Sequence, residues 1–310
     1  GKYIAYVVRE AIMTDKKSEF LSQIWVSNTG GSQSIQYTFN EKSSTSPKFS
    51  PDGNKIAFLS SRSGKNQIWI MNTLGGEAKK LTDEKKGVRS IKWSPDGNNI
   101  SFLKNDNDTE EETKSKKNKT DVILVDKNFK YSHIYSYNLN YDSVTQITKG
   151  NFSVNNFDYS PKGERMIFSH QDDTNINTGF VNTDISLIES DGSNMKNIIS
   201  RPGLDSDPVF SGDGNKCTFI SSGGRQESIG LRDVYIYDLE NQKTIKLSDT
   251  PNRDSNIISW SSDNKMVIIS ENVNTTSQVI MLPVNGNRYI SWSYNKYKVG
   301  VISSVVKSKQ

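Results

Sequence analysis

The fold is decided by the stretch Phe49-Ser50-Pro51-Asp52-Gly53-Asn54-Lys55-Ile56-Ala57-Phe58-Leu59. An aromatic residue and a serine end one strand, a Pro-Asp-Gly turn follows, and an apolar strand then begins. Proline presets φ at the first central position of a type I turn, and glycine accepts the positive φ that comes after it. Copies of this motif recur along the chain at residues 93–97, 159–163, 210–214, 260–264 and 292–296, and the copy at residues 93–97 is the most similar in sequence.

Two further strands recur with each copy. Triplets of β-branched and aromatic residues, such as Ile68-Trp69-Ile70 and Val234-Tyr235-Ile236, are typical of short strands. A hairpin rich in Gly or Asn, such as Gly75-Gly76-Glu77, then leads to a last strand. Each unit therefore contains four strands. A repeat of roughly 50 residues built from strands indicates a radial array.

The predicted fold class is all-β, a β-propeller of four-stranded antiparallel blades. One such sheet cannot bury both faces, whereas sheets stacked around an axis bury each face against a neighbour. The aromatic residue before each serine is accordingly expected to pack between blades. Turn motifs at residues 1, 50, 94, 160, 211, 261 and 293 predict seven blades, of which the first and last are incomplete. Six blades closed by a returning C-terminal strand would leave residues 298–303 unexplained.

Composition supports one domain over residues 1–310. Hydrophobic residues make up 33% of the chain, which fits short strands separated by polar turns. The 39 basic and 35 acidic residues are interspersed and give a net charge of only +4, so a nucleic-acid partner is not expected. No apolar stretch is long enough to span a membrane, and no signal peptide is visible.

The sequence offers no catalytic, cofactor-binding or metal-binding residues. Cys217, the single cysteine, aligns with the apolar Ile56 and is predicted to be a small buried residue. His133 and His170 adjoin strands and are predicted to lie at strand edges. There is no Gly-x-Ser-x-Gly elbow, no Cys/His cluster for zinc and no Gly-rich phosphate loop. Residues that bind a substrate or partner are not identified by any motif.

Insertions mark the places where a partner is expected. The longest, at about residues 104–121, has no apolar residue to bury and is predicted to be a flexible charged loop. Calcium ligation by Asp106, Asp108 and residues 110–112 is disfavoured, because the spaced oxygens and central Gly of a calcium loop are missing. Residues 10–22, 171–184 and 223–232 are predicted to extend from blade edges toward one face.

The repeat resembles that of TolB-like propellers and of the propellers of the prolyl oligopeptidase family. Gly64-Lys65-Asn66-Gln67-Ile68-Trp69-Ile70 and Gly75-Gly76-Glu77-Ala78-Lys79-Lys80-Leu81-Thr82 match both. The charged insert is followed by Asp121-Val122-Ile123-Leu124-Val125-Asp126 and Lys130-Tyr131-Ser132-His133-Ile134-Tyr135. This uneven spacing is similar to the acylaminoacyl-peptidase and dipeptidyl-peptidase branch of the family, whereas TolB repeats are more even.

The resemblance implies a non-catalytic propeller that acts as a gate and lid. Its partner would be a C-terminal α/β-hydrolase domain of the same protein, which is absent from this chain and would carry the Ser-Asp-His residues. The implied enzyme is a serine peptidase that releases acyl-amino acids or short peptides from peptide N-termini, and homo-oligomers of the full-length protein are allowed. The alternative is a TolB-like module that binds a protein partner. The expected location is the cytoplasm, with export left open because the native N-terminus is not seen.

Overall fold

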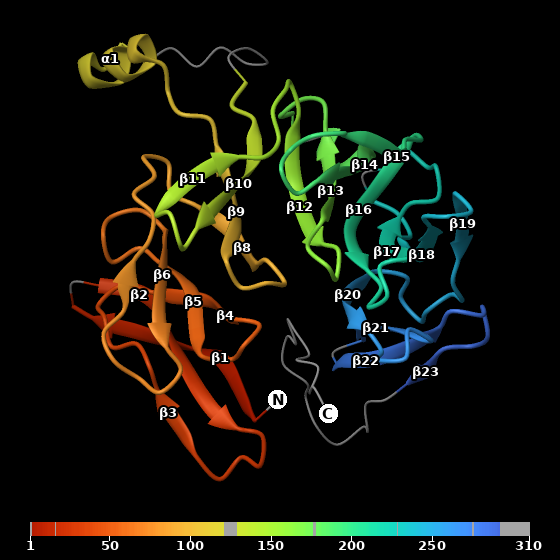
Figure 1. Cartoon of the computed structure of the whole chain (residues 1–310), viewed down its shortest axis with the longest axis horizontal. Coiled ribbons are helices and arrows are strands. Elements are labelled where there is room, and N and C mark those ends of the chain that lie inside the picture. The colour runs from red at the N-terminus through yellow and green to blue at the C-terminus, as the bar shows by residue number, and fades with distance from the viewer. Residues whose placement is uncertain are drawn as a thin grey trace. The chain divides into compact units, whose positions relative to one another are not determined.

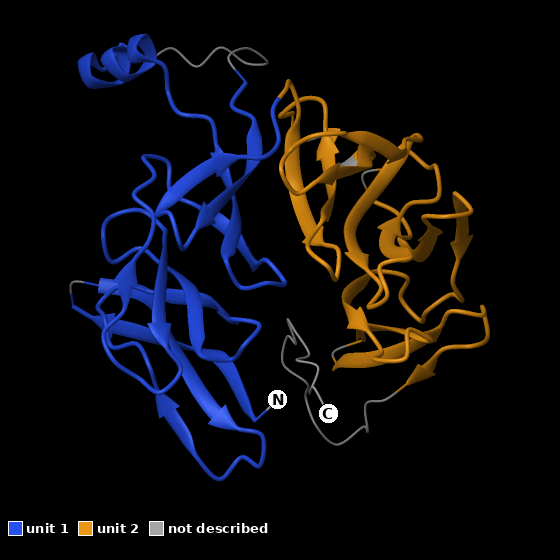
Figure 2. Cartoon of the chain, viewed as in Figure 1, with its two compact units in different colours: residues 1–149, 308–310 blue, residues 150–307 orange. Residues whose placement is uncertain are grey.

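The structure is a computed structural model that describes residues 2–15, 17–120, 129–175, 178–227, 229–274 and 276–291. The regular structure in these ranges is almost entirely antiparallel β-sheet (Figure 1). The chain divides into two compact units, one that runs to Lys149 and one that begins at Gly150 (Figure 2). The single domain expected over residues 1–310 stays a prediction.

The first unit contains three sheets. Sheet 1 has three strands, β1 (Tyr3–Thr14), β2 (Lys17–Asn28) and β3 (Ser34–Gln36). Sheet 2 has four strands, β4 (Ser44–Phe49), β5 (Lys55–Ser60), β6 (Gln67–Asn72) and β7 (Lys79–Lys80). Sheet 3 also has four, β8 (Arg89–Trp93), β9 (Asn99–Asn105), β10 (Ser132–Asn138) and β11 (Ser143–Gln146). Helix α1 (Glu110–Asn118) lies in the link between β9 and β10.

The second unit repeats the pattern. Sheet 4 comprises β12 (Ser153–Tyr159), β13 (Arg165–Gln171), β14 (Asn182–Glu189) and β15 (Lys196–Ile199), with the short helix α2 (Thr178–Val181) before β14. Sheet 5 comprises β16 (Gly203–Phe210), β17 (Lys216–Ser221), β18 (Asp233–Asp238) and β19 (Lys243–Lys246). Sheet 6 comprises β20 (Ser255–Trp260), β21 (Met266–Val273), β22 (Thr276–Pro283) and β23 (Ile290–Ser291). A short parallel pairing of β14 with β16 joins sheets 4 and 5.

The Ser-Pro-Asp-Gly motif forms the turn expected from its sequence. In sheet 2 the Gly53 amide donates to the Ser50 carbonyl at 2.9 Å, and the Ser50 hydroxyl accepts from the Lys55 amide at 2.9 Å. Gly53 has a φ of 76°, and Asn264 holds the same left-handed position in sheet 6 with a φ of 59°. Asparagine is one of the few residues that tolerates this region, which is why the copy without glycine still turns.

The blade count of seven is not confirmed, because the described residues form six repeats of the sheet. Ile290 and Ser291 pair with Met281 and Ile280 of β22, as the fourth strand of sheet 6. In the other copies the residues before the aromatic form the first strand of a new sheet. The residues before Trp292 therefore have a different role from the one the motif predicted, and residues 292–310 lie outside the described residues.

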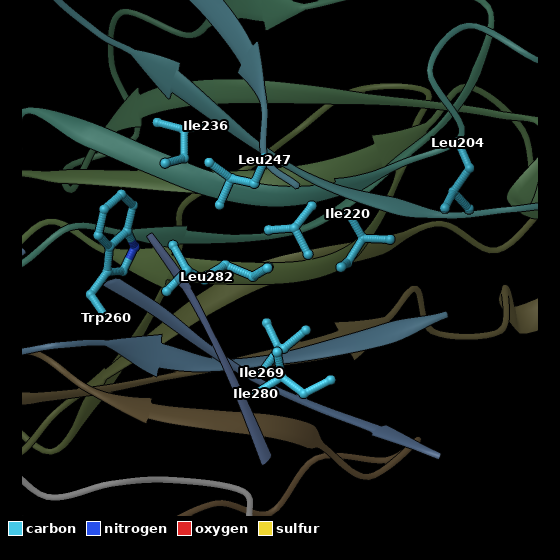
Figure 3. Close-up of a cluster of buried hydrophobic side chains, with 10 residues drawn as sticks. Leu204, Ile220, Ile236, Leu247, Trp260, Ile269, Ile280 and Leu282 are labelled. Carbon is cyan, nitrogen blue, oxygen red and sulfur yellow. The ribbon is translucent and has the colours of Figure 1, made fainter. Parts of the chain in front are cut away.

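Apolar clusters fill the space between neighbouring sheets within each unit. In the second unit Ile220, Ile236 and Leu247 of sheet 5 face Trp260, Ile269, Ile280 and Leu282 of sheet 6 (Figure 3). The motif aromatics belong to these clusters, as Trp93 and Phe210 do between other sheets. The Trp260 indole also donates to the Val209 carbonyl across the sheets at 3.1 Å. The prediction that these aromatics pack between blades is therefore confirmed for Phe49, Trp93, Phe210 and Trp260, whereas Trp292 lies outside the described residues.

Two of the insertions differ from the loops that were predicted. Residues 104–105 belong to β9, and residues 110–118 form helix α1, which buries no side chain. Thr109 and Glu112 form a reciprocal capping box, and acidic residues in the first turn oppose lysines in the last. Residues 10–14 extend β1 and residues 17–22 belong to β2, and the two strands pair from Tyr3↔Asn28 to Thr14↔Lys17, with Arg9 stacked on Phe20. Regular backbone hydrogen bonds and local charge thus replace hydrophobic burial in these segments.

Candidate functional site

The three residues inspected for catalysis lie apart in different sheets and are buried. The His133 ring contacts the Thr148 hydroxyl at 3.3 Å, in the position that Gln67 takes beside Thr82 in sheet 2. His170 contacts the Ser186 hydroxyl at 2.8 Å. Burial raises the pKa of the Cys217 thiol, which keeps it protonated and unreactive. All three are buried within their sheets, where a substrate cannot meet them.

A different set of side chains gathers at the end of the sheets opposite the turns. Here a cation lies over the aromatic pair formed by the second and third strands of a sheet. Arg62 lies over Phe58 and Trp69, with 4.6 Å from its guanidinium carbon to the Trp69 ring centroid. Lys104 lies 4.0 Å from the Tyr135 ring centroid in sheet 3. Such stacking covers an aromatic edge while the charge stays near solvent.

Sheet 5 has the same cation but a different row of residues beneath it. Asp205, Ser221 and Asp233 are direct neighbours across β16, β17 and β18, and this set is called the carboxylate row below. All three are buried, with exposed fractions of 0%, 0% and 5%. The equivalent row of sheet 2 is Ser44, Ser60 and Gln67, which carries no charge.

Arg201 covers one end of the carboxylate row. Its Nε and Nη2 donate to the two Asp205 oxygens at 3.1 and 2.9 Å, and Nη2 also donates to the Ser221 hydroxyl at 2.6 Å. The guanidinium carbon is 5.0 Å from the Tyr235 ring centroid and 5.8 Å from that of Phe219. Stacking and a forked ion pair together fix the orientation of this arginine.

Arg253 covers the other end, from the link between β19 and β20. Its Nε and Nη2 donate to the two Asp233 oxygens at 2.7 and 2.6 Å. Lys246 adds a second cation 3.0 Å from Asp233 and also pairs with Asp249. Arg201 and Arg253, called the arginine pair below, thus use the same Nε–Nη2 edge to hold a buried aspartate.

The pKa values of the two aspartates, Asp205 and Asp233, are shifted in opposite directions. Burial raises the pKa of Asp205, and its bonds to Arg201 and Ser221 offset only part of that effect. For Asp233, burial is outweighed by Arg253 and Lys246, and its pKa is lowered. Keeping the buried Asp205 carboxylate charged therefore costs free energy.

A shallow cleft of about 320 Å³ lies between sheets 2 and 3 in the first unit. Its lining combines apolar side chains with two lysines and two acids: Ile70, Met71, Leu81, Leu139, Lys55, Lys79, Glu77 and Asp142. The Tyr137 hydroxyl donates to Asp142, and burial with this bond raises the pKa of Tyr137 to about 12. The cleft holds no nucleophile beside a base, so its chemistry is limited to binding.

The arginine pair was not found by sequence reasoning. Arg201, Arg253 and the carboxylate row come from five different strands or links, and only strand register brings them together. Asp205 stands where sheet 2 has Ser44, and Asp233 stands where sheet 2 has Gln67. In the part of the chain that the structure describes, no group of His, Cys, Asp and Glu could hold a metal ion.

Among the described residues, no helix combines the length and the apolar character needed to cross a membrane. Three carboxylates of the charged insert, those of Asp106, Asp108 and Glu112, have partners. Asp108 pairs with Lys86 at 2.5 Å and Lys116 at 3.0 Å, and Asp106 accepts from the Tyr131 amide at 3.0 Å. Their oxygens are therefore used within the fold.

Sequence comparison links part of the chain to peptidases. Residues 19–120 match the family described as the tricorn protease N-terminal β-propeller domain. A segment of 64 residues is 39% identical to the uncharacterized peptidase YuxL of Bacillus subtilis (strain 168), and covers 21% of this chain and 9% of that protein. The chain thus spans a small part of this relative.

Structural comparison supports the propeller fold over most of the chain. An acylaminoacyl peptidase in complex with Z-Gly-Gly-Phe-chloromethyl ketone has a TM-score of 0.67 and 18% identity, covering 90% of this chain and 43% of that one. TolB from Acinetobacter baumannii has a TM-score of 0.59 and 18% identity, covering 93% of this chain and 65% of that one. These matches confirm the resemblance to peptidase and TolB-like propellers.

Proposed function

We propose that this chain is the non-catalytic propeller of a serine peptidase, and that it gates access of short peptides to a hydrolase domain. The observation that carries this proposal is the match of the repeats to peptidase propellers in both sequence and structure. The chain spans 43% of the acylaminoacyl peptidase, which leaves room for a catalytic domain of the kind that such enzymes place after the propeller.

The arrangement of reactive side chains is consistent with a role that lacks catalysis. His133, His170 and Cys217 are buried in separate sheets, and the described residues place no serine beside a histidine in an accessible cleft. His170 contacts Ser186, but the histidine and serine are exposed by only 3% and 0%. A nucleophile must meet its substrate, so this pair cannot act as one.

The first experiment is a hydrolysis assay of the purified chain with acyl-aminoacyl and dipeptidyl chromogenic substrates. We expect no turnover above buffer. The control is the intact protein, which includes whatever follows Gln310, and which should hydrolyse the same substrates. The proposal would be refuted if the isolated chain still hydrolysed these substrates after repurification and in the presence of a serine-directed inhibitor that blocks contaminating enzymes.

The second candidate is a TolB-like module that binds a protein partner. The observation that favours it is the likeness to TolB from Acinetobacter baumannii over 93% of this chain. In that case the propeller itself would be the functional unit. The reading frame distinguishes the two: a downstream Gly-x-Ser-x-Gly domain supports the peptidase, and an exported N-terminal domain upstream supports the binding module.

A further inference from the structure

We infer that the long hairpin of β1 and β2 is a docking surface for a second copy of this chain (Figure 1). The segment that carries the contact is residues 9–13 of β1, called the outer edge below. It pairs antiparallel with the outer edge of the partner copy. The surface belongs to the first unit, and the inference is independent of the proposed function.

The outer edge extends past the body of sheet 1. Val8 pairs with Gln23 as Ser60 pairs with Gln67 in sheet 2, so Val8 and Ser60 hold equivalent positions. In sheets 2, 5 and 6 the paired register of the first and second strands ends at this level. β1 continues beyond it to Thr14, and among the described residues it pairs only with β2. A first strand of the usual length would therefore not cover the outer edge.

The outer edge presents backbone donors and acceptors on the side away from β2. The amide and carbonyl of Ile24 bond to the residues just after β3, so they turn away from Val7, the residue opposite. Bonded and unbonded pairs alternate along an antiparallel ladder, which puts Arg9, Ala11 and Met13 in the same phase as Val7. No bulge interrupts this ladder and no proline stands in it, so the edge lacks the usual protection against pairing.

Exposed apolar side chains lie beside these backbone groups. Met13 is 78% exposed and Phe20, which lies opposite Ala11, is 60% exposed. The guanidinium carbon of Arg9 is 3.9 Å from the Phe20 ring centroid and covers part of that ring. An unpaired strand edge flanked by exposed apolar side chains is typical of an interaction surface.

The outer edge is complementary to itself, which is why a second copy is the occupant. A two-fold axis at Ala11 sets this residue opposite its own copy and Arg9 opposite Met13, and all of these residues direct their backbone groups outward. Glu10 then faces Ile12, so no like charges are directly opposed. An axis at Arg9 or at Glu10 would oppose like charges. Self-complementarity about a two-fold axis is what an isologous dimer requires.

The association is expected to be weak, because one pair of short strand edges buries less than the roughly 1,200 Å² of a standard interface. We expect a dissociation constant on the order of 100 µM. Sedimentation equilibrium of the purified chain from about 10 µM to 1 mM should show a monomer that becomes a dimer. Over the same range, amide hydrogen exchange at Arg9, Ala11 and Met13 should slow as the concentration rises.

Two variants and a matched control test the outer edge. Ala11→Pro removes an amide that β2 does not use, and Met13→Lys sets a lysine opposite Arg9 of the partner copy. Each should weaken dimerisation about tenfold or more. Ile35→Lys changes a side chain that is 58% exposed on β3, away from β1, and should leave dimerisation unchanged. Circular dichroism checks folding, and Met13→Lys keeps the test valid if Ala11→Pro does not fold.

Three results would overturn the inference. One is a chain that stays monomeric up to about 1 mM; slow exchange of the three amides at every concentration would then assign the edge to another segment of the same chain. Another is a dimer that both outer-edge variants leave intact, which would place the contact elsewhere. The third is equal weakening by Ile35→Lys, which would indicate unspecific apolar association.

Discussion

At the residue scale, His170 shows how a polar side chain is accommodated between aromatic neighbours. Its ring centroid lies 5.1 Å from that of Phe152 and 5.5 Å from that of Phe168. Its Nε2 contacts Ser186, while among the described residues the buried Nδ1 has no hydrogen-bond partner. Burial lowers the pKa of His170, although Asp184 and Asp172 oppose the shift. The neutral imidazole is therefore the form that the fold prefers.

This preference predicts a loss of stability in mild acid. Because the folded pKa of His170 is below its ordinary value of 6.5, the unfolded chain binds more protons as the pH falls below 6.5. The unfolding free energy should then decrease from pH 7.5 to pH 5.5, as measured by urea denaturation. His170→Gln should remove this decrease. If the variant loses as much stability as the original chain over that range, His170 is not its source.

At the scale of elements, the sheets are held to one another by apolar clusters and by a few directional bonds. The indoles of Trp93 and Trp260 each donate to a carbonyl of the first strand in the preceding sheet, that of Lys48 at 3.0 Å and that of Val209 at 3.1 Å. The repeat of the same bond in both units indicates that it sets the spacing of neighbouring sheets. The buried Trp69 indole, in contrast, has no acceptor in the part of the chain that the structure describes.

Replacement of these tryptophans by phenylalanine separates the bond from the packing. Trp260→Phe should lose the indole bond in addition to ring volume, and Trp69→Phe should lose volume and part of the stacking with Arg62. We therefore expect Trp260→Phe to be destabilised by about 1 kcal/mol more than Trp69→Phe, the usual contribution of one hydrogen bond. Urea denaturation of both variants gives the comparison. Equal losses would mean that the cross-sheet bond adds nothing.

At the scale of the whole molecule, the chain consists of two units that repeat one sheet design. The designs differ in what covers the end opposite the turns, where sheet 2 has hydroxyls beneath its arginine and sheet 5 has carboxylates. Sheets 4 and 6 also carry a carboxylate in the equivalent row, where Asp184 pairs with His170 and Glu271 pairs with Ser255.

Under the proposed function, the propeller controls the size of the substrate. Deletion of residues 1–310 from the intact protein should keep hydrolysis of small chromogenic substrates, provided that the remaining domain folds. It should also increase cleavage of longer or folded polypeptides, because a gate no longer excludes them. The measurement is the ratio of kcat/KM for a long and a short peptide. An unchanged ratio in a folded deletion variant would argue against gating.

The helix in the charged insert was predictable in part. Thr109-Glu110-Glu111-Glu112 is a capping box, and lysines follow in the last turn. The expectation of a loop relied on the lack of apolar residues and passed over these local signals. The capping box and the charge order act within one short segment, so the sequence alone was enough to indicate them.

The sequence by itself determined the turns, the strands and the fold class, because each depends on neighbours in the chain. Pro51 and Gly53 specify a turn wherever they occur together, and alternating apolar residues specify a strand. Only the tertiary structure decided that Asp205, Ser221 and Asp233 form one row, and that Arg201 and Arg253 close its ends. Strand register and sheet packing bring these distant positions together, and neither is encoded in any local pattern.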